Sequence, residues 1–258
     1  MPTVEAIERM LYAWAPKELA MDWDNTGLLV GDPMQEVDTV LVALDITPAV
    51  VQEAIDCGAQ LIVAHHPVMN CTWHPVQTLR EDDVQGKILR TLVKHDISAI
   101  CMHTNLDAAQ IGVNDCLAEK LGLLEISAFN DGKIGRIGTL KSQIPLEEFL
   151  PFVVKSLGCS GLRYIDGGLS VKKVMVGGGA CRDYIPLALA NGCDTFVTSD
   201  LKYNDFLDTV GLNLIDAGHF STEQVVCEEV CKRLGAAFGT LTVLQSERHN
   251  KEVIQFYT

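Results

Sequence analysis

Residues 39–67 read TVLVALDITPAVVQEAIDCGAQLIVAHHP, and this stretch decides the fold. The apolar runs at 39–44 and 60–64 each have the length and the β-branched content of a buried strand. Between them, Pro48 is a typical first residue of a helix and Gly58 a typical stop. The stretch therefore predicts two parallel strands joined by a crossover helix, which is the repeating unit of an α/β fold.

The alternation of strands and helices continues along the whole chain. An amphipathic helix is expected to begin near Thr3. Further strands are expected at 97–102, 134–140, 171–176, 194–198, 212–215 and 240–244, with 134–140 at a sheet edge. Further helices are expected at 85–94, 113–121, 145–157, 181–190 and 221–234. The pattern predicts an α/β protein made of two facing α/β layers with mainly parallel strands, the first half at 1–126 and the second at 127–258.

Composition narrows the class of protein. The chain has 258 residues with 48% hydrophobic and 21% charged residues, which is typical of a soluble globular protein. Its apolar runs are too short for a membrane span, and charges interrupt residues 1–9 before a signal peptide could form. The formal charge of −14 disfavours nucleic-acid binding, although a small anionic substrate is compatible with it if bound cations reverse the local field. The nine cysteines contain no CxxC pair, which indicates reduced thiols and a cytoplasmic protein.

Three separate clusters carry side chains that bind metals, and each follows an apolar run. Their candidate ligands are His65, His66, His103, Asp107, His219 and Glu223. Imidazole and carboxylate groups suit zinc, manganese, iron and nickel comparably well. In an open α/β sheet the carboxyl ends of the strands line the ligand cleft. Together the clusters predict a metal centre built at the strand ends, with His219 and Glu223 supplied by the second half.

Each cluster also has a simpler interpretation. The two adjacent histidines fit a polar loop, and Asp107 fits either a loop that bonds its own backbone or the cap of the following helix. Glu223 fits a first-turn acid, in a helix that Ser221 or Thr222 would cap. Taken singly, the second and third clusters favour these interpretations.

Other polar residues near the predicted strand ends are candidates for a supporting role. Asp45 and Asp200 each end a strand, and each is expected to face substrate or to contact a metal ligand. Asp24 and Asn25 lie in a turn-rich segment where they either contact substrate or form Asx turns. The three glycines at 177–179 lie between a strand and a helix, so they either cradle a phosphate or, more simply, form a tight turn.

Several stretches resemble the GTP cyclohydrolase I type 2 homologue family, also called Nif-three-like proteins. They are WDNTGLLVGD (23–32), LDITPAVVQEAIDCGAQLIVAHHP (44–67), HTNLDAA (103–109), VTSDLKYNDFLD (197–208) and DAGHFSTE (216–223). The resemblance implies a two-domain α/β protein that binds two divalent cations per subunit in the cleft between its two layers. It also implies a toroidal homohexamer. It places the ligands at His65, His66, Asp107, His219 and Glu223, with Glu223 bridging both ions, and leaves His103 to complete or orient the set.

The resulting hypothesis is a metal-dependent hydrolase of a nucleotide or related small molecule. In it His66 and Asp107 hold one ion, His65 and His219 hold the other, and a metal-activated water attacks the substrate. Glu223 and His103 are the expected catalytic residues, with His103 the first candidate and Asp24 the second for general acid or base. The alternative, from a different class, is a metal-binding scaffold or regulatory protein without turnover.

Overall fold

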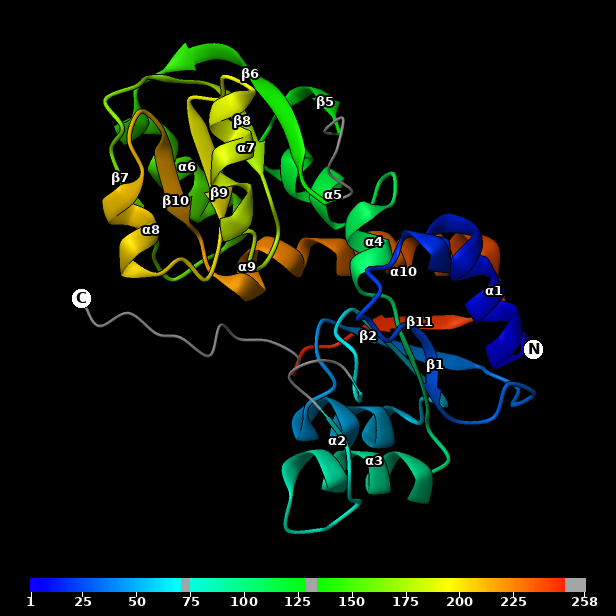
Figure 1. Cartoon of the computed structure of the whole chain (residues 1–258). Helices are drawn as coiled ribbons and strands as arrows, with labels where there is room; N and C mark the ends of the chain where they lie inside the picture. Colours follow the sequence, from blue (N-terminus) through cyan, green and yellow to red (C-terminus); the bar gives the residue numbers. More distant parts are fainter. Residues whose placement is uncertain (71–74, 129–133, 249–258) are drawn as a thin grey trace. The chain divides into compact units, whose positions relative to one another are not determined.

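The computed structural model describes residues 1–70, 75–128 and 134–248 (Figure 1). Within these residues the chain forms two compact units, one made of residues 1–110 and 227–248 and the other of residues 111–226. Each unit has its own β-sheet, with helices packed on it. The predicted α/β class is therefore confirmed, and each sheet can be examined by itself.

The first unit contains a five-stranded sheet in the order β1-β4-β3-β2-β11. Its elements are α1 (Val4–Trp14), η1 (Lys17–Leu19), β1 (Gly27–Val30), β2 (Thr39–Ala43), α2 (Pro48–Cys57), β3 (Leu61–Ala64), α3 (Val84–Lys94), β4 (Ser98–Cys101), α4 (Thr104–Ala108), most of α10 (Val225–Ala237) and β11 (Thr242–Gln245). Strands β4, β3, β2 and β11 are parallel, and β1 is antiparallel to β4. This sheet is mainly parallel, as predicted.

Local sequence explains why the first crossover helix forms where it does. The side chain of Thr47 accepts a hydrogen bond from the backbone of Val50, and Pro48 occupies the first turn of α2. The helix ends at Gly58, whose φ of +68° is the left-handed conformation that glycine adopts without steric cost. Thr3 caps α1 in the same way by accepting from Ala6. The predicted starts of both helices are thus confirmed.

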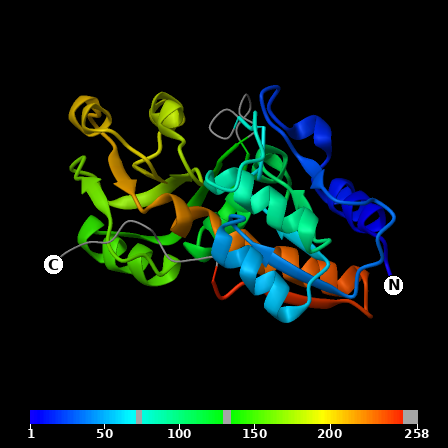
Figure 2. The same cartoon turned by 90° about the horizontal axis from the view of Figure 1, so that it is seen from below.

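Helices cover both faces of the first sheet. On one face, buried residues of α2 and α3 pack against alternate residues of β2, β3 and β4. Figures 1 and 2 show α1 and α10 on the opposite face. The strands are consequently buried on both sides, which explains their near-continuous apolar runs.

The second unit contains a six-stranded sheet in the order β5-β6-β8-β9-β10-β7. Its elements are α5 (Val113–Lys120), β5 (Leu124–Ser127), β6 (Arg136–Ile144), α6 (Leu146–Leu157), β7 (Arg163–Ile165), β8 (Val171–Val176), η2 (Arg182–Tyr184), α7 (Ile185–Ala190), β9 (Thr195–Thr198), α8 (Tyr203–Asp208), β10 (Asn213–Asp216) and α9 (His219–Glu223). Strands β8, β9 and β10 are parallel, whereas the other pairings are antiparallel. This sheet is mixed rather than mainly parallel.

The core of the second unit lies between its sheet and two helices. Buried residues of α5 and α6 pack on β8, β9 and β10, with Phe149 of α6 fully buried. Figure 1 shows α7 on the other face of the sheet. The parallel strands β8, β9 and β10 therefore form the protected centre of this unit.

Several predicted elements differ from the observed ones. The strand expected at 134–140 as a sheet edge is β6, which is internal because β5 pairs with it, and β5 was not predicted. The helix expected at 181–190 is divided into η2 and α7, and the one at 221–234 into α9 and α10. One boundary between the halves was predicted near residue 126, whereas the compact units divide between Gln110 and Ile111 and again between Val226 and Cys227. Part of the glycine-rich stretch around 127–138 lies outside the described residues.

Two compositional expectations can be compared with the structure. Among the helices of the described segments, none is long and apolar enough to cross a membrane. The cysteines that the structure describes are free thiols, and most of them are buried. Buried free thiols behave as small apolar residues, so packing is their main role.

Candidate functional site

In the first unit, three parallel strands place four polar residues at one edge of the sheet. Asp45 follows β2, His65 and His66 follow β3, and His103 follows β4. The strands are in register, since Ala64 pairs with Ala43 on one side and with Cys101 on the other. The predicted strand-end ligands of this unit are therefore side by side.

The three histidines form a compact cluster. One ligand nitrogen from each of His65, His66 and His103 lies within 4.8 Å of the others. The ring of His65 is 4.9 Å from that of His66 and 5.2 Å from that of His103, measured between centroids. His65 and His103 are buried. Several nitrogen donors are thus directed at one small volume, so the cluster is a candidate metal-binding group.

Asp107 joins this cluster from α4. His103 is the N-cap of that helix and Asp107 lies four residues later, so both side chains lie on the same side of its first turn. The Oδ1 atom of Asp107 is 3.6 Å from Nε2 of His65. Asp107 does not cap the following helix, since Gly112 is the N-cap of α5. That alternative interpretation of Asp107 is therefore wrong.

Hydrogen bonds fix which nitrogen each histidine offers. The Nδ1 atom of His65 is 2.8 Å from the carbonyl oxygen of Met102, which can only accept. Nδ1 of His66 is 2.7 Å from Asp45, and Nδ1 of His103 is 2.8 Å from Asp24. Each Nδ1 therefore donates a proton to its oxygen partner, which leaves Nε2 as the nitrogen available to a cation. A carbonyl or carboxylate on the far nitrogen is the usual arrangement of histidines that bind metal.

Asp24 bonds His103 and Thr104 within the protein. Its side chain is fully buried, and besides His103 it accepts hydrogen bonds from the backbone N–H and the hydroxyl of Thr104. Burial alone would raise the pKa of Asp24, but the hydrogen bonds from His103 and Thr104 outweigh it and lower the pKa to about 2. Asp24 stays ionised near neutral pH, so it is unsuited to the general acid or base role considered for it. Asn25 is likewise bound to protein, because its amide donates to the carbonyl of Met69.

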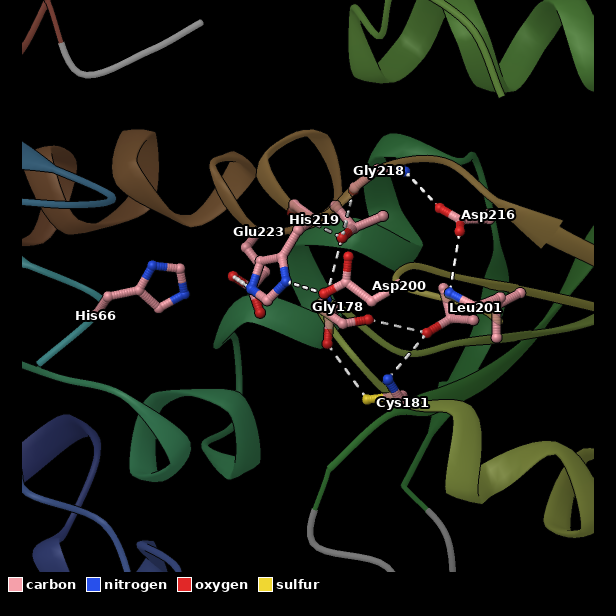
Figure 3. Close-up of polar contacts among 12 residues, drawn as sticks. His66, Gly178, Cys181, Asp200, Leu201, Asp216, Gly218, His219 and Glu223 are labelled. Carbon is pink, nitrogen blue, oxygen red and sulfur yellow. Dashed lines mark hydrogen bonds and ion pairs between the residues drawn. The ribbon is translucent and has the colours of Figure 1, made fainter. Parts of the chain in front are cut away.

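The second unit has a similar arrangement at the ends of its own parallel strands (Figure 3). The glycines at 177–179 follow β8, Asp200 follows β9, and His219 follows β10. Nδ1 of His219 is 2.6 Å from Asp200, and its Nε2 is 2.9 Å from Oε2 of Glu223. His219 and Glu223 therefore form a nitrogen and carboxylate pair, and Asp200 holds the other ring nitrogen of His219.

Asp216 holds the backbone beside His219 and beside Asp200. Its Oδ1 accepts from the N–H of Gly218, and its Oδ2 accepts from the N–H of Leu201, each at 3.1 Å. Gly218 precedes His219 and Leu201 follows Asp200, so one carboxylate fixes the segments that carry both partners (Figure 3). Arg163 forms an ion pair with the same carboxylate. Sequence reasoning missed Asp216, whose contacts depend on β9 and β10 lying side by side.

Two carboxylates raise the pKa of His219. Burial alone would lower it, but the charge of Glu223 and the hydrogen bond to Asp200 outweigh that effect and raise the pKa to about 11. In the absence of a cation, His219 is therefore protonated at neutral pH. A cation that binds Nε2 must displace this proton.

The glycine loop makes room for Glu223 and does not bind phosphate. The backbone N–H groups of Gly177, Gly178 and Gly179 donate to Val197 O, Asn114 Oδ1 and Thr222 Oγ1, respectively. These N–H groups are thus already used within the protein, which rules out the phosphate-cradle interpretation. Gly179 has a φ of +67°, and a Cβ at this residue would lie 2.1 Å from Oε1 of Glu223. The loop is the tight turn that the sequence also allowed.

The predicted cap of the last helix is wrong. The helical segment begins at His219, with Gly218 as the N-cap and no side-chain cap. Ser221 and Thr222 lie inside α9 and are buried. Thr222 is used differently, since its hydroxyl accepts from Gly179 and contacts the carbonyl of Gly218 at 3.0 Å. It therefore joins the glycine loop to the start of α9.

Comparison with known proteins identifies the family of the chain. The family model described as Duf34/NIF3 (NGG1p interacting factor 3) matches residues 2–251. The chain belongs to this family. Among its Duf34/NIF3 relatives, a GTP cyclohydrolase 1 type 2 homolog of Clostridium perfringens is 34% identical over 230 residues, covering 85% of this chain and 86% of the relative.

Solved structures give the same result. The Staphylococcus aureus hypothetical protein SA1388 is 30% identical, with a TM-score of 0.92 and coverage of 99% of each chain. Reduced HcgD from Methanocaldococcus jannaschii is 28% identical, with a TM-score of 0.81 and coverage of 95% of this chain and 98% of that one. The Duf34/NIF3 fold is therefore shown by both sequence and structure.

The residues of both units fit divalent cations. Four histidines have Nδ1 bonded to an oxygen acceptor, and a carboxylate faces Nε2 of both His65 and His219. A set of imidazole and carboxylate donors suits zinc, manganese, iron or nickel. The space left by Gly179 beside Glu223 is a further sign of fit, because any side chain there would displace the Glu223 carboxylate.

Proposed function

We propose that this Duf34/NIF3 protein is a metal-dependent hydrolase of a nucleotide or a related small molecule. The observation that carries the proposal is the common orientation of His65, His66, His103 and His219, whose Nδ1 atoms all meet an oxygen acceptor. Such pre-orientation costs conformational freedom and has a clear use when Nε2 binds a cation. The relatives named GTP cyclohydrolase 1 type 2 homolog suggest a nucleotide as substrate.

Two divalent cations per chain are proposed, held by His65, His66, Asp107, His219 and Glu223. When bound, such cations lower the pKa of a shared water and polarise the substrate. The distance of 3.6 Å between His65 and Asp107 supports assigning these two residues to the same ion. This changes the division suggested by the sequence, which paired Asp107 with His66. Glu223 keeps its proposed role as the bridging carboxylate.

The remaining polar residues orient the histidines or transfer protons. Asp24, Asp45 and Asp200 hold the protons on their histidines at Nδ1. His103 is the proposed general acid or base, because it is the histidine of the cluster outside the five ligands. Its Nδ1–H is fixed by an ionised Asp24, so it would accept or donate a proton at Nε2.

The proposed setting is a cytoplasmic homohexamer. The sequence resemblance supports the hexamer, and the free thiols of the described residues support a reducing compartment. The acidic composition supports a small-molecule substrate over nucleic acid.

Metal per chain, measured by elemental mass spectrometry, is the first test. Wild-type protein purified without chelators should contain about two ions per chain, and Glu223→Ala should contain fewer. Glu147→Ala is the matched control, since Glu147 is an exposed acid in the first turn of α6. Wild-type protein without metal under every loading condition would overturn the proposal.

Turnover is the second test. Metal-loaded protein should hydrolyse at least one member of a panel of nucleotides and phosphoesters, and His66→Ala should abolish this activity. Metal binding with no turnover across the panel would favour the scaffold or regulatory alternative over the hydrolase.

A further inference from the structure

Trp23 is a large apolar side chain that remains half exposed, at 50%. Its indole ring lies 6.0 Å from the imidazole of His103, between centroids, at an interplanar angle of 69°. A ring stacked on the indole would therefore lie near His103. An isolated exposed aromatic residue is ordinary, so the case depends on how this one is held.

The turn that carries Trp23 is fixed at both ends. Its backbone is closed by the N–H of Asp24, which donates to the carbonyl of Met21 at 3.0 Å. The N–H of Met21 donates to the hydroxyl of Thr104 at 2.9 Å, and the carboxylate of Asp24 accepts from the backbone of Thr104 at 3.0 Å. The turn is thus anchored to the start of α4, the helix that carries Asp107.

A second anchor joins the same turn to the other histidine segment. The side chain of Asn25 donates to the carbonyl of Met69 at 2.8 Å, and Met69 follows His65 and His66 by only a few residues. The Trp23 turn is therefore attached to both segments that supply the histidine cluster. A rigid backbone with an exposed indole is the arrangement that recognition sites use, because little conformational entropy is lost on binding.

Trp14 shows what a structural tryptophan looks like in the same unit. Its indole N–H donates to the carbonyl of Gln110, and the guanidinium of Arg233 lies 4.2 Å from its ring centroid. Trp14 thus joins α1 to α10. Trp23 is half exposed, so much of its indole surface lies in solvent.

We propose that Trp23 is a stacking platform that binds a planar heteroaromatic ring of the substrate beside the histidine cluster. The inference rests on the proposed function and narrows its substrate class to molecules with such a ring, of which a purine nucleotide is one. Every flat heteroaromatic ring has a π-face, so stacking selects the ring and leaves its exact substitution to other residues.

The test compares two ligands that differ by the ring. GMP and ribose 5-phosphate are titrated by calorimetry into manganese-loaded wild type, Trp23→Leu and Trp23→Phe. Wild type should bind GMP about tenfold more tightly than ribose 5-phosphate. Trp23→Leu keeps apolar bulk without a ring and should lose this advantage, whereas Trp23→Phe should retain part of it. Ribose 5-phosphate should bind all three proteins equally.

Two results would overturn the stacking role. One is a wild-type protein that binds GMP no more tightly than ribose 5-phosphate. The other is a Trp23→Leu variant that keeps the full advantage of GMP. If that variant also changes the sedimentation coefficient, Trp23 is a contact between copies of the chain.

Metal content, measured on the same samples, separates this inference from the proposed function. Absence of metal from the wild type counts against the hydrolase. A normal metal content without a ring preference counts against Trp23 alone.

Discussion

Gly179 is the residue where backbone conformation and ligand position depend most directly on each other. In Gly179→Ala the added methyl group would lie 2.1 Å from Glu223 Oε1 and 3.2 Å from His219 Nε2. The carboxylate must move, so we expect metal affinity to fall about 10- to 100-fold, as when a supporting residue of a metal site is lost. A competition titration against a chelating dye measures the change.

Gly192→Ala is the matched control for this substitution. Gly192 has nearly the same backbone conformation, with φ of +64°, but a Cβ there meets nothing within 4 Å. Both variants carry the strain of alanine in the left-handed region, about 1 kcal/mol. An equal loss of metal affinity in the two variants would show that backbone strain, and not contact with Glu223, causes the loss.

Asp24 should make the free energy of unfolding depend on pH in the acid range. Its pKa falls from an ordinary 3.8 to about 2 on folding, so the native state binds fewer protons than the unfolded state. Its contribution is therefore complete above about pH 4 and is lost as the pH falls towards 2. With chelator present, Asp24→Asn should lower the free energy of unfolding at pH 7 by on the order of 2 kcal/mol, with the deficit shrinking towards pH 2.

Urea denaturation at several pH values checks this expectation. The exposed neighbour Asp22 provides the control, because Asp22→Asn should leave the profile unchanged. A deficit of the same size at pH 2 and pH 7 would mean that the charge of Asp24 contributes nothing.

The sequence identified the candidate ligands better than the residues that orient them. His65, His66, His103 and His219 were found because each follows an apolar run. Asp45 and Asp200 were found for the same reason, and the structure shows that each bonds a histidine. Asp24 was predicted as a substrate contact or as a general acid or base, and its pairing with His103 was missed because the two lie 79 residues apart. The Met102 carbonyl that bonds His65 carries no side-chain signal.

At the scale of elements, those with local sequence signals were predicted, whereas those that depend on pairing between distant segments were not. Helix α2 was predicted at its observed bounds because Pro48 and Gly58 mark its ends. Strand β1 was read as a turn-rich segment, and its four residues are held extended by antiparallel pairing with β4. Helix α4 has only five residues, and its first backbone N–H is bound by Asp24. Such contacts have no signature in a local window.

Helix α2 should hold the segment that follows β11. The carboxylate of Glu53 accepts from the hydroxyl of Ser246 and from the N–H groups of Glu247 and Arg248. Glu53→Ala should lower the free energy of opening of this segment by about 1–3 kcal/mol, because a buried hydroxyl and two amides lose their acceptor. Hydrogen exchange of residues 242–248 measures the opening.

The adjacent residue supplies the control. Gln52 is exposed on the same helix, where it bonds Asp56, so Gln52→Ala should change this exchange by about 0.5 kcal/mol or less. Equal exchange in the two variants would show that pairing with β2 alone holds β11.

At the scale of the whole molecule, the two units differ in how their sheets are assembled. The six strands of the second unit come from one continuous stretch, residues 111–226. The first unit needs β11, which lies beyond that stretch, to complete its sheet beside β2. A fragment of residues 111–226 should therefore fold by itself and unfold cooperatively.

A fragment of residues 1–110 should behave differently. Without β11, the apolar strand β2 becomes an open edge, and such edges promote association. Circular dichroism and light scattering of both fragments test the contrast. A monomeric, cooperatively folding 1–110 fragment, or an unstructured 111–226 fragment, would contradict it.

The order of these segments along the chain also determines when each one leaves the ribosome. The nascent chain exposes the valine-rich β2 early, but its partner β11 emerges only after the entire second unit has been synthesised. During that interval the second unit can fold, whereas the first unit exposes the edge of β2 that β11 will later cover. Exposed strand edges are surfaces that chaperones bind. Slow translation would lengthen this vulnerable interval, so codon choice between β4 and β11 should influence the yield of native protein.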